Sequence, residues 1–351
     1  MKQRLFRVLA AVAATSLVTV GLVTTPAAPS SATESSATQA SAAQSSAAAG
    51  SYVALGDSYS SGTGTRSYIA DGTECLRSTY AYASLTAAAK GYSLNFRACS
   101  GAVVADVTST QLSALTATTT YVTISVGGND AGFADVLTEC ALPAWASDCA
   151  GAVAGARSFI SSALPGRLST LYAAIRTRAP NAKVVVVGYP KIFMGEDCNV
   201  ATFFSPEDEA ALNDAVVLIN SVTRSAASAR GFTFVDPVSR FTGHAVCDST
   251  EWINGFSSPV QESYHPNRLG HSNGYLPLVS GVLTGASVAA TPAVLAEARD
   301  GAAAQAKLQQ KYAAADRSIR PKLFQPPTKA RLERLAKERG VDFDTWWAQT
   351  R

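Results

Sequence analysis

The segment Lys183-Val184-Val185-Val186-Val187-Gly188 constrains the fold of this chain more strongly than any other stretch. A continuous run of β-branched residues is typical of a strand buried on both faces, and such strands occur in parallel sheets that helices cover on both sides. Weaker apolar runs predict four companion strands, at residues 52–55, 93–96, 121–126 and 232–235.

Helical patterns separate these strands, at residues 79–90, 151–178 and 207–230. Strands that alternate with helices form right-handed βαβ units. The sequence therefore predicts an α/β protein with three α/β/α layers and a mainly parallel, five-stranded sheet. In such a sheet the functional side chains lie beyond the carboxyl ends of the strands.

The amino-terminal region has the layout of a secretory signal: the basic residues Lys2, Arg4 and Arg7, then an apolar stretch, then small residues. A membrane anchor is the alternative, but the apolar stretch is short and interrupted by polar residues. We assign residues 1–32 to a signal peptide with an approximate cleavage site. Residues 33–50, rich in Ser and Ala, are expected to be a flexible linker.

The rest of the chain consists of two regions that differ in amino-acid composition. Residues 51–288 carry the alternating pattern and are assigned to a catalytic domain. Residues 289–351 are polar, with basic residues in excess and three interrupting prolines. We expect helices at residues 292–320 and 328–340 in this C-terminal extension, which we interpret as a solvated appendage without a catalytic role.

Six cysteines are present, and an even number in an exported chain predicts disulfides. Fifteen pairings are possible for six cysteines, and spacing alone does not choose among them. Sequential pairing is the simplest. A zinc site is a weak alternative, because the chain has no Cys-x-x-Cys and three histidines. The sequential pairs would be Cys75–Cys99, Cys140–Cys149 and Cys198–Cys247.

Ser58 lies in a Gly-Asp-Ser run directly after the first predicted strand, at a sharp strand-to-helix turn. A serine hydroxyl becomes a nucleophile when a base takes its proton and donors hold the oxyanion that it creates. Taken alone, the short run also fits an ordinary turn serine. Its partners elsewhere in the chain favour the catalytic interpretation.

Hydrogen-bond donors for an oxyanion follow two other predicted strands. Asn129, in Gly-Gly-Asn-Asp, can donate from its side-chain amide, and the backbone N–H groups of Gly101 and Ser58 are further candidates. Each of these residues, taken alone, also fits an ordinary turn. Because all three follow strands, we expect them to meet at one edge of the sheet.

His265 is the best candidate base among His244, His265 and His271, because a proline follows it and restricts the local backbone. We expect packing roles for the other two histidines. Glu262, three residues earlier, could orient the imidazole through its other nitrogen, as the carboxylate of a catalytic triad does. A main-chain carbonyl of the same loop is the alternative.

These separated blocks together resemble the SGNH/GDSL hydrolase superfamily, and within it the secreted bacterial lipases and esterases with three disulfides. The resemblance covers about residues 51–284 and implies a flavodoxin-like sheet and sequential disulfides. It implies Ser58 as nucleophile, His265 as base, and an oxyanion hole made by Ser58, Gly101 and Asn129. The family usually has Asp where this chain has Glu262, so a dyad and a triad both stay open.

The resemblance predicts a secreted serine ester hydrolase that works through an acyl-enzyme, without metal or organic cofactor. We expect an acyl ester or lipid substrate, transient contact with lipid surfaces and a monomer. The net charge of +3 argues against a nucleic acid partner. The alternatives are a phospholipase A, a carbohydrate acetyl esterase and a non-catalytic envelope-binding protein. Apolar side chains near the motifs fit an acyl chain: Tyr59, Tyr68, Phe133, Val136 and Leu137.

Overall fold

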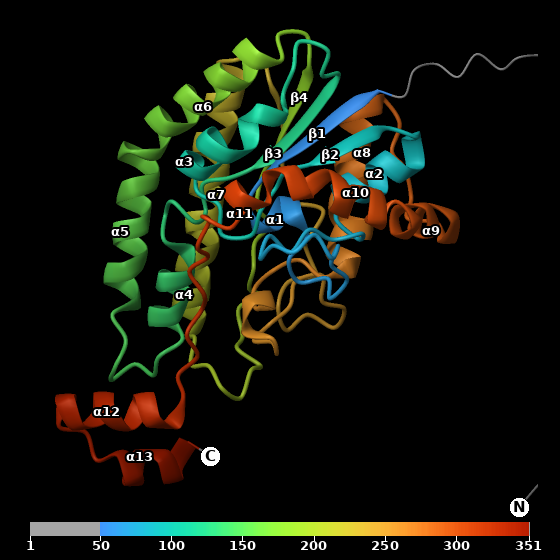
Figure 1. Ribbon diagram of the computed structural model, residues 1–351. Helices are drawn as coiled ribbons and strands as arrows, with labels where there is room; N and C mark the ends of the chain where they lie inside the picture. Colours follow the sequence, from blue (N-terminus) through green and yellow to red (C-terminus); the bar gives the residue numbers. More distant parts are fainter. Residues whose placement is uncertain (1–49, 351) are drawn as a thin grey trace, which may run out of the picture. The chain divides into compact units, whose positions relative to one another are not determined.

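The sheet has five strands, all parallel, and each lies at one of the positions expected from the sequence. The computed structural model describes residues 50–350, so the predicted signal peptide and nearly all of the linker lie outside the described residues. The strand order is β2-β1-β3-β4-β5, which is the flavodoxin-like order (Figure 1). The strands are β1 (Ser51–Gly56), β2 (Ser93–Phe96), β3 (Tyr121–Ser125), β4 (Lys183–Val187) and β5 (Thr233–Val235).

Helices surround the sheet and confirm the three-layer α/β/α prediction. Helices α2 (Tyr82–Lys90) and α8 (Leu276–Thr284) contact each other beside the sheet, and α6 (Leu164–Arg178) and α7 (Pro206–Ser228) form a second contacting pair. The valines of β4 are buried, as their uninterrupted run predicts. Between these elements lie α1 (Ser58–Ser61), α3 (Val104–Asp106), α4 (Phe133–Cys140) and α5 (Cys149–Ser162).

One predicted helix is wrong in its extent. The sequence pattern over residues 151–178 suggested a single helix, but the structure contains two, α5 and α6, which meet at Ala163. Pro165 lies in the first turn of α6. A proline has no N–H to continue the hydrogen bonds of a helix, and it is tolerated in a first turn. The chain therefore starts a new helix there.

The C-terminal extension packs on the catalytic domain, so the expectation of a solvated appendage is wrong. Helix α10 contacts β2, α9 contacts α2, and Ile319 and Phe324 are buried in the main hydrophobic core. The expected helix at residues 292–320 is broken, at Gly301 and again after α10. The helices here are α9 (Pro292–Asp300), α10 (Ala302–Gln309), α11 (Ala313–Asp316), α12 (Lys329–Arg339) and α13 (Phe343–Thr350).

All six cysteines form disulfides, and they pair in sequence order. A zinc site built from these sulfurs is therefore excluded. Within residues 50–350, no helix is both long enough and apolar enough to cross a membrane. The disulfides are Cys75–Cys99, Cys140–Cys149 and Cys198–Cys247.

Candidate active site

Ser58 is the first residue of α1, and a single residue, Asp57, separates it from the end of β1. Gly56 has a φ of 120°, and a Cβ there would lie 2.3 Å from the carbonyl oxygen of Ser125, so the turn requires glycine. Asp57 caps the short helix, because its side chain accepts a 3.0 Å hydrogen bond from the N–H of Tyr59. The turn places the Ser58 side chain in a cleft at the carboxyl ends of the strands.

His265 faces Ser58 directly. Its Nε2 lies 2.8 Å from the Ser58 hydroxyl oxygen, and its Nδ1 lies 2.9 Å from the main-chain carbonyl oxygen of Ser263. A carbonyl oxygen can only accept, so the proton resides on Nδ1 and the lone pair of Nε2 points at the serine hydroxyl. The arrangement is that of a nucleophile and its base.

The loop before His265 is held in an unusual conformation. Tyr264 has a φ of 59°, the left-handed region that few residues other than glycine adopt. Its carbonyl oxygen accepts a 2.7 Å hydrogen bond from the hydroxyl of Tyr59, and its side chain is fully buried. These contacts compensate the backbone strain and orient the imidazole.

Of the two groups considered for orienting His265, the structure places the Glu262 carboxylate against other residues. The buried carboxylate of Glu262 accepts a 2.6 Å hydrogen bond from the hydroxyl of Tyr68 and a 2.9 Å hydrogen bond from Nε of Arg66. The turn that ends at Glu262 directs its side chain towards these two residues. The carbonyl of Ser263, which was the alternative, occupies the orienting position at His265.

Burial lowers the pKa of His265 to about 4, although its hydrogen bond to Ser263 acts in the opposite direction. The imidazole is therefore neutral at neutral pH and able to accept a proton. Burial raises the pKa of Asp57 to about 7, against the hydrogen bonds from Tyr189 and the Tyr59 N–H. The contacts of Asp57 are those of a turn-stabilising residue.

The predicted oxyanion donors meet at the same cleft as Ser58 and His265, because Gly101 and Asn129 both line it. The Cys75–Cys99 disulfide lies just before Gly101, and the N–H of Cys99 donates to the carbonyl of Gly56 at 3.0 Å. The Asn129 amide donates one hydrogen bond, of 3.1 Å, to the carbonyl of Ala102. No second acceptor for this amide is found among residues 50–350, so its other N–H is available for a substrate oxygen.

Two backbone donors beside Ser58 are also available. Within residues 50–350, no hydrogen bond engages the backbone N–H of Ser58 or that of Gly101. Unpaired N–H groups that line a cleft can stabilise a developing negative charge on a bound substrate. The separated sequence blocks are thus brought together by the sheet.

The cleft continues from Ser58 into an apolar channel between α4, α5 and α7. Of the apolar residues singled out from the sequence, Tyr59, Phe133, Val136 and Leu137 line it, whereas Tyr68 bonds to Glu262 instead. A cleft lined by apolar side chains suits an acyl chain. The other apolar lining residues include Val153, Ile160, Ile192, Leu212, Val216 and Ile219.

Sequence reasoning missed two sets of cleft residues. Tyr189 donates a 2.6 Å hydrogen bond to Asp57 and accepts one of 3.1 Å from the N–H of Gly128, so it joins two motifs. Residues 321–324 of the C-terminal extension also line the cleft. The position of Tyr189, two residues after the end of β4, was a weak indication in the sequence that it could lie near the site. No sequence feature indicated that the C-terminal extension lines the cleft.

The two remaining histidines lie outside the cleft lining. His271 is fully buried, and its Nδ1 accepts a 3.3 Å hydrogen bond from the N–H of Tyr82. Burial lowers its pKa to about 3. His244 stacks on Trp252 with ring centroids 3.7 Å apart. Both sets of contacts are those of packing residues.

A parallel α/β sheet that carries a serine–histidine pair, free N–H donors and an apolar cleft at its carboxyl edge has the arrangement of a serine ester hydrolase. The family model of the GDSL-like Lipase/Acylhydrolase family matches residues 54–272, and the chain belongs to this family. The predicted SGNH/GDSL membership is therefore confirmed, and the chain is an SGNH-type ester hydrolase.

Named relatives support the assignment. The chain is 46% identical to Lipase 1 of Streptomyces coelicolor over 236 residues, which are 66% of this chain and 87% of that protein. The crystal structure of an extracellular lipase from Streptomyces rimosus superposes with a TM-score of 0.64 and 44% identity. Phospholipase A1 from Streptomyces albidoflavus gives a TM-score of 0.63 and 43% identity.

The matches to these two solved structures cover almost the whole of each of them. The match accounts for 100% of the S. rimosus lipase chain and 99% of the phospholipase chain, but for 67% of this chain in each case. About a third of this chain therefore lies outside each of these matches.

Proposed function

We propose that this chain is a secreted lipase in which Ser58 is the nucleophile and His265 the general base. The observation that carries the proposal is the 2.8 Å contact between the Ser58 hydroxyl oxygen and Nε2 of His265. It is supported by the 2.9 Å contact of Nδ1 with the Ser263 carbonyl oxygen, which leaves the Nε2 lone pair free. The catalytic unit is a serine–histidine dyad with a main-chain carbonyl as third member.

The proposed reaction proceeds in two halves. Nε2 of His265 takes the hydroxyl proton as Ser58 attacks the ester carbonyl carbon, and the resulting oxyanion is held by the N–H groups of Ser58 and Gly101 and by the Asn129 amide. When the tetrahedral intermediate collapses, the imidazolium protonates the departing alcohol. Water then attacks the acyl-enzyme by the same route, which releases the carboxylic acid and restores Ser58.

An acyl lipid is the substrate class that the cleft fits best. Apolar side chains of α4, α5 and α7 line the channel beyond Ser58, and they suit an alkyl chain of some length. A carbohydrate acetyl ester would leave this channel unused. A phospholipase A activity is the second candidate, because a relative with 43% identity bears the name phospholipase A1.

Export and contact with lipid surfaces complete the proposal. The three disulfides and the name of the extracellular S. rimosus relative support an oxidising, external location. Helix α12 carries five basic residues, a composition suited to brief contact with an anionic lipid surface, while the tryptophans of α13 pack on aromatic side chains such as Trp145 and Phe343. Ser58, His265, Gly101 and Asn129 already form a complete site within one copy of the chain, so we propose that a monomer is active.

The test is hydrolysis of p-nitrophenyl esters from acetyl to palmitoyl by wild type and Ser58→Ala. We expect activity that peaks at medium or long chains and disappears in the variant. Replacement of Asn129 by Ala should lower kcat by about 10²–10³-fold. Ser109→Ala, an exposed serine at the surface, is the matched control. A Ser58→Ala protein with full activity would refute the mechanism, and a wild type that neither hydrolyses esters nor reacts with an organophosphate would favour a binding protein.

A further inference from the structure

Residues 318–325 of the C-terminal extension form an extended segment between α11 and α12, which we call the strap. Figure 1 shows it as the red coil that runs down past α4 and α7. Four consecutive strap residues, Pro321, Lys322, Leu323 and Phe324, line the same cleft as Ser58 and His265. The polar extension thus supplies three apolar residues, Pro321, Leu323 and Phe324, to the substrate side of the enzyme.

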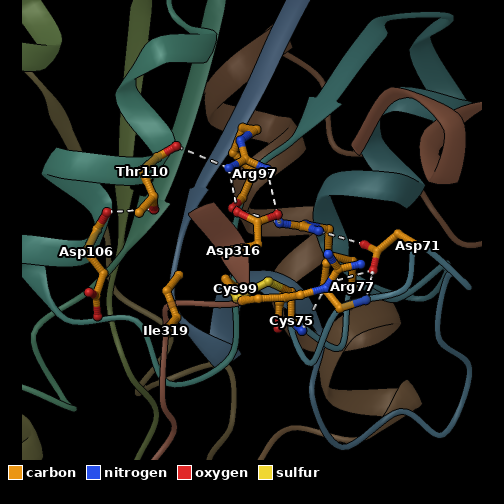
Figure 2. Close-up of a disulfide and its surroundings, with 12 residues drawn as sticks. Asp71, Cys75, Arg77, Arg97, Cys99, Asp106, Thr110, Asp316 and Ile319 are labelled. Carbon is orange, nitrogen blue, oxygen red and sulfur yellow. Dashed lines mark hydrogen bonds and ion pairs between the residues drawn. A yellow bond between two sulfur atoms is a disulfide. The ribbon is translucent and has the colours of Figure 1, made fainter. Parts of the chain in front are cut away.

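The strap is anchored at its start by a buried cluster of charges (Figure 2). Asp316, at the end of α11, receives hydrogen bonds of 2.6 and 3.0 Å from the guanidinium of Arg97 and one of 2.6 Å from Arg77. The side chains of all three residues are fully buried. A bidentate pair between buried groups is geometrically specific, so it holds the chain in one position.

Further contacts hold the strap along the cleft. The N–H of Gln325 donates a 2.8 Å hydrogen bond to the Thr138 hydroxyl of α4. The ring of Phe324 packs edge-on against Tyr264, the residue before His265, with centroids 5.1 Å apart. The strap therefore bridges the α4 side of the cleft and the loop that carries the proposed base.

Pro321 lies directly against Gly101, one of the proposed oxyanion donors. A Cβ added to Gly101 would lie 2.4 Å from the Cα of Pro321, so the two backbones approach as closely as a glycine permits. Leu323, two residues after Pro321, lines the cleft and is 36% exposed. An apolar side chain that is partly exposed in a cleft is available to a bound alkyl group.

We propose that the strap is a wall of the acyl-chain channel and that Leu323 and Phe324 determine which acyl chains this enzyme prefers. The proposal rests on the ester hydrolase function proposed above. The extension is then a specificity element of the active site. The family match ends at residue 272, so the strap lies beyond the part of the chain that defines the family.

The experiment compares kcat/KM for p-nitrophenyl butyrate and p-nitrophenyl laurate in the full mature chain. Variants are Leu323→Ala, which removes methylene contacts without opening a buried cavity, and Phe324→Leu, which keeps the core filled. Val217→Ala is the matched control, because Val217 is a half-exposed valine on α7 that does not line the cleft. We expect the laurate-to-butyrate ratio to fall about tenfold in both strap variants, since a change of one or two methylene contacts alters kcat/KM by roughly 10–200-fold.

The outcomes separate the two proposals. If wild type hydrolyses these esters and the ratio in both strap variants equals that of wild type and Val217→Ala, the strap proposal is overturned and the enzyme function stands. An equal loss of rate on both esters would also overturn it, because that result reports disturbance of His265 through Tyr264. If wild type hydrolyses neither ester, the proposed function fails and the strap proposal with it.

Hydrogen exchange supplies a second readout that does not depend on turnover. A dodecyl phosphonate and an ethyl phosphonate are each attached covalently to Ser58, with p-nitrophenol as leaving group in both cases. We expect slower exchange at residues 318–325 with the dodecyl compound than with the ethyl compound. Equal exchange in the two adducts would contradict the strap as a wall for the acyl chain.

Discussion

The hydroxyl of Tyr59 donates a 2.7 Å hydrogen bond to the main-chain carbonyl of Tyr264, and so joins the residue after Ser58 to the residue before His265. The two proposed catalytic side chains are 207 positions apart in the sequence, and this buried bond links the side chain of the residue after Ser58 to the backbone of the residue before His265. It also stabilises a residue with a left-handed φ of 59°. We therefore expect the contact to hold the serine–histidine pair in its geometry without entering the reaction.

Replacement of Tyr59 by Phe tests this positioning role. The variant keeps the ring and loses the hydroxyl, so we expect about 1 kcal/mol less stability. We expect kcat to fall roughly tenfold, because small displacements of reacting groups are costly, with KM nearly unchanged. Steady-state kinetics and thermal unfolding measure the two effects. A kcat equal to that of wild type would show that Tyr264 and His265 keep their position without this bond.

The role of Glu262 gives a second prediction. Its carboxylate binds Arg66 and Tyr68, so we expect Glu262→Gln to lower the melting temperature and to leave kcat within about threefold of wild type. A triad carboxylate would behave differently, because its loss costs about 10⁴-fold in kcat. The same ester assay separates the two results. A loss of that size with an intact fold would restore Glu262 as the third catalytic member.

Much of the fold could be predicted from the sequence because it depends on local patterns. The β-branched run of β4 requires burial on both faces, and glycine, serine and asparagine recur where strands end, at Ser58 and Asn129. The sheet then brings these ends together. These features are encoded within a few residues each.

The orienting group at His265 and the place of the extension could not be predicted in this way. Whether Glu262 or the Ser263 carbonyl orients His265 depends on the path of the loop, which includes the left-handed φ of Tyr264. The spacing of apolar and polar residues does not predict such a φ. Asp316 looks like a solvated residue of a polar helix. Its burial depends on Arg77 and Arg97, more than 200 residues earlier in the chain. Such long-range charge pairing leaves no local signal.

The lowered pKa of His265 predicts the pH dependence of the reaction. The neutral imidazole is the base, and a pKa of about 4 keeps it neutral well below its ordinary value of 6.5. We expect the acidic limb of the kcat/KM profile on a non-ionising ester to have an apparent pKa near 4. An apparent pKa near 6.5 would contradict the buried environment of His265.

The lowered pKa values of the buried histidines also predict how the stability of the fold depends on pH. The pKa values of His265 and His271 are lowered to about 4 and about 3, so each of these two groups binds more protons in the unfolded than in the folded chain below about pH 6.5. Their contribution to the free energy of unfolding therefore falls as pH decreases from about 6.5 towards 4. The raised pKa of Asp57 acts in the opposite sense over the same interval, so the histidine contribution is isolated with a variant. Thermal melts of wild type and His271→Phe between pH 4 and 8 measure it. A difference in melting temperature between the two proteins that does not shrink as the pH falls would contradict it.

The buried cluster at Asp316 predicts that the C-terminal extension is required for a stable enzyme. Among residues 50–350, removal of this carboxylate leaves Arg77 with Asp71 as its remaining carboxylate partner and Arg97 with none. Breaking a buried ion pair from one side costs about 3–5 kcal/mol, so Asp316→Ala should lower the free energy of unfolding by an amount of this order. Truncation after residue 288 should be at least as destabilising, because it also removes Ile319 and Phe324 from the core.

Lys322→Ala is the matched control for this prediction, since Lys322 forms an exposed ion pair with Asp135 in the same extension. Exposed pairs contribute about 0–1 kcal/mol, so this variant should unfold close to wild type. Denaturant unfolding followed by tryptophan fluorescence compares the three proteins. If Asp316→Ala and the truncated chain unfolded at the same denaturant concentration as Lys322→Ala, the extension would be a removable appendage and the anchoring of the strap through Arg77 and Arg97 would be disproved.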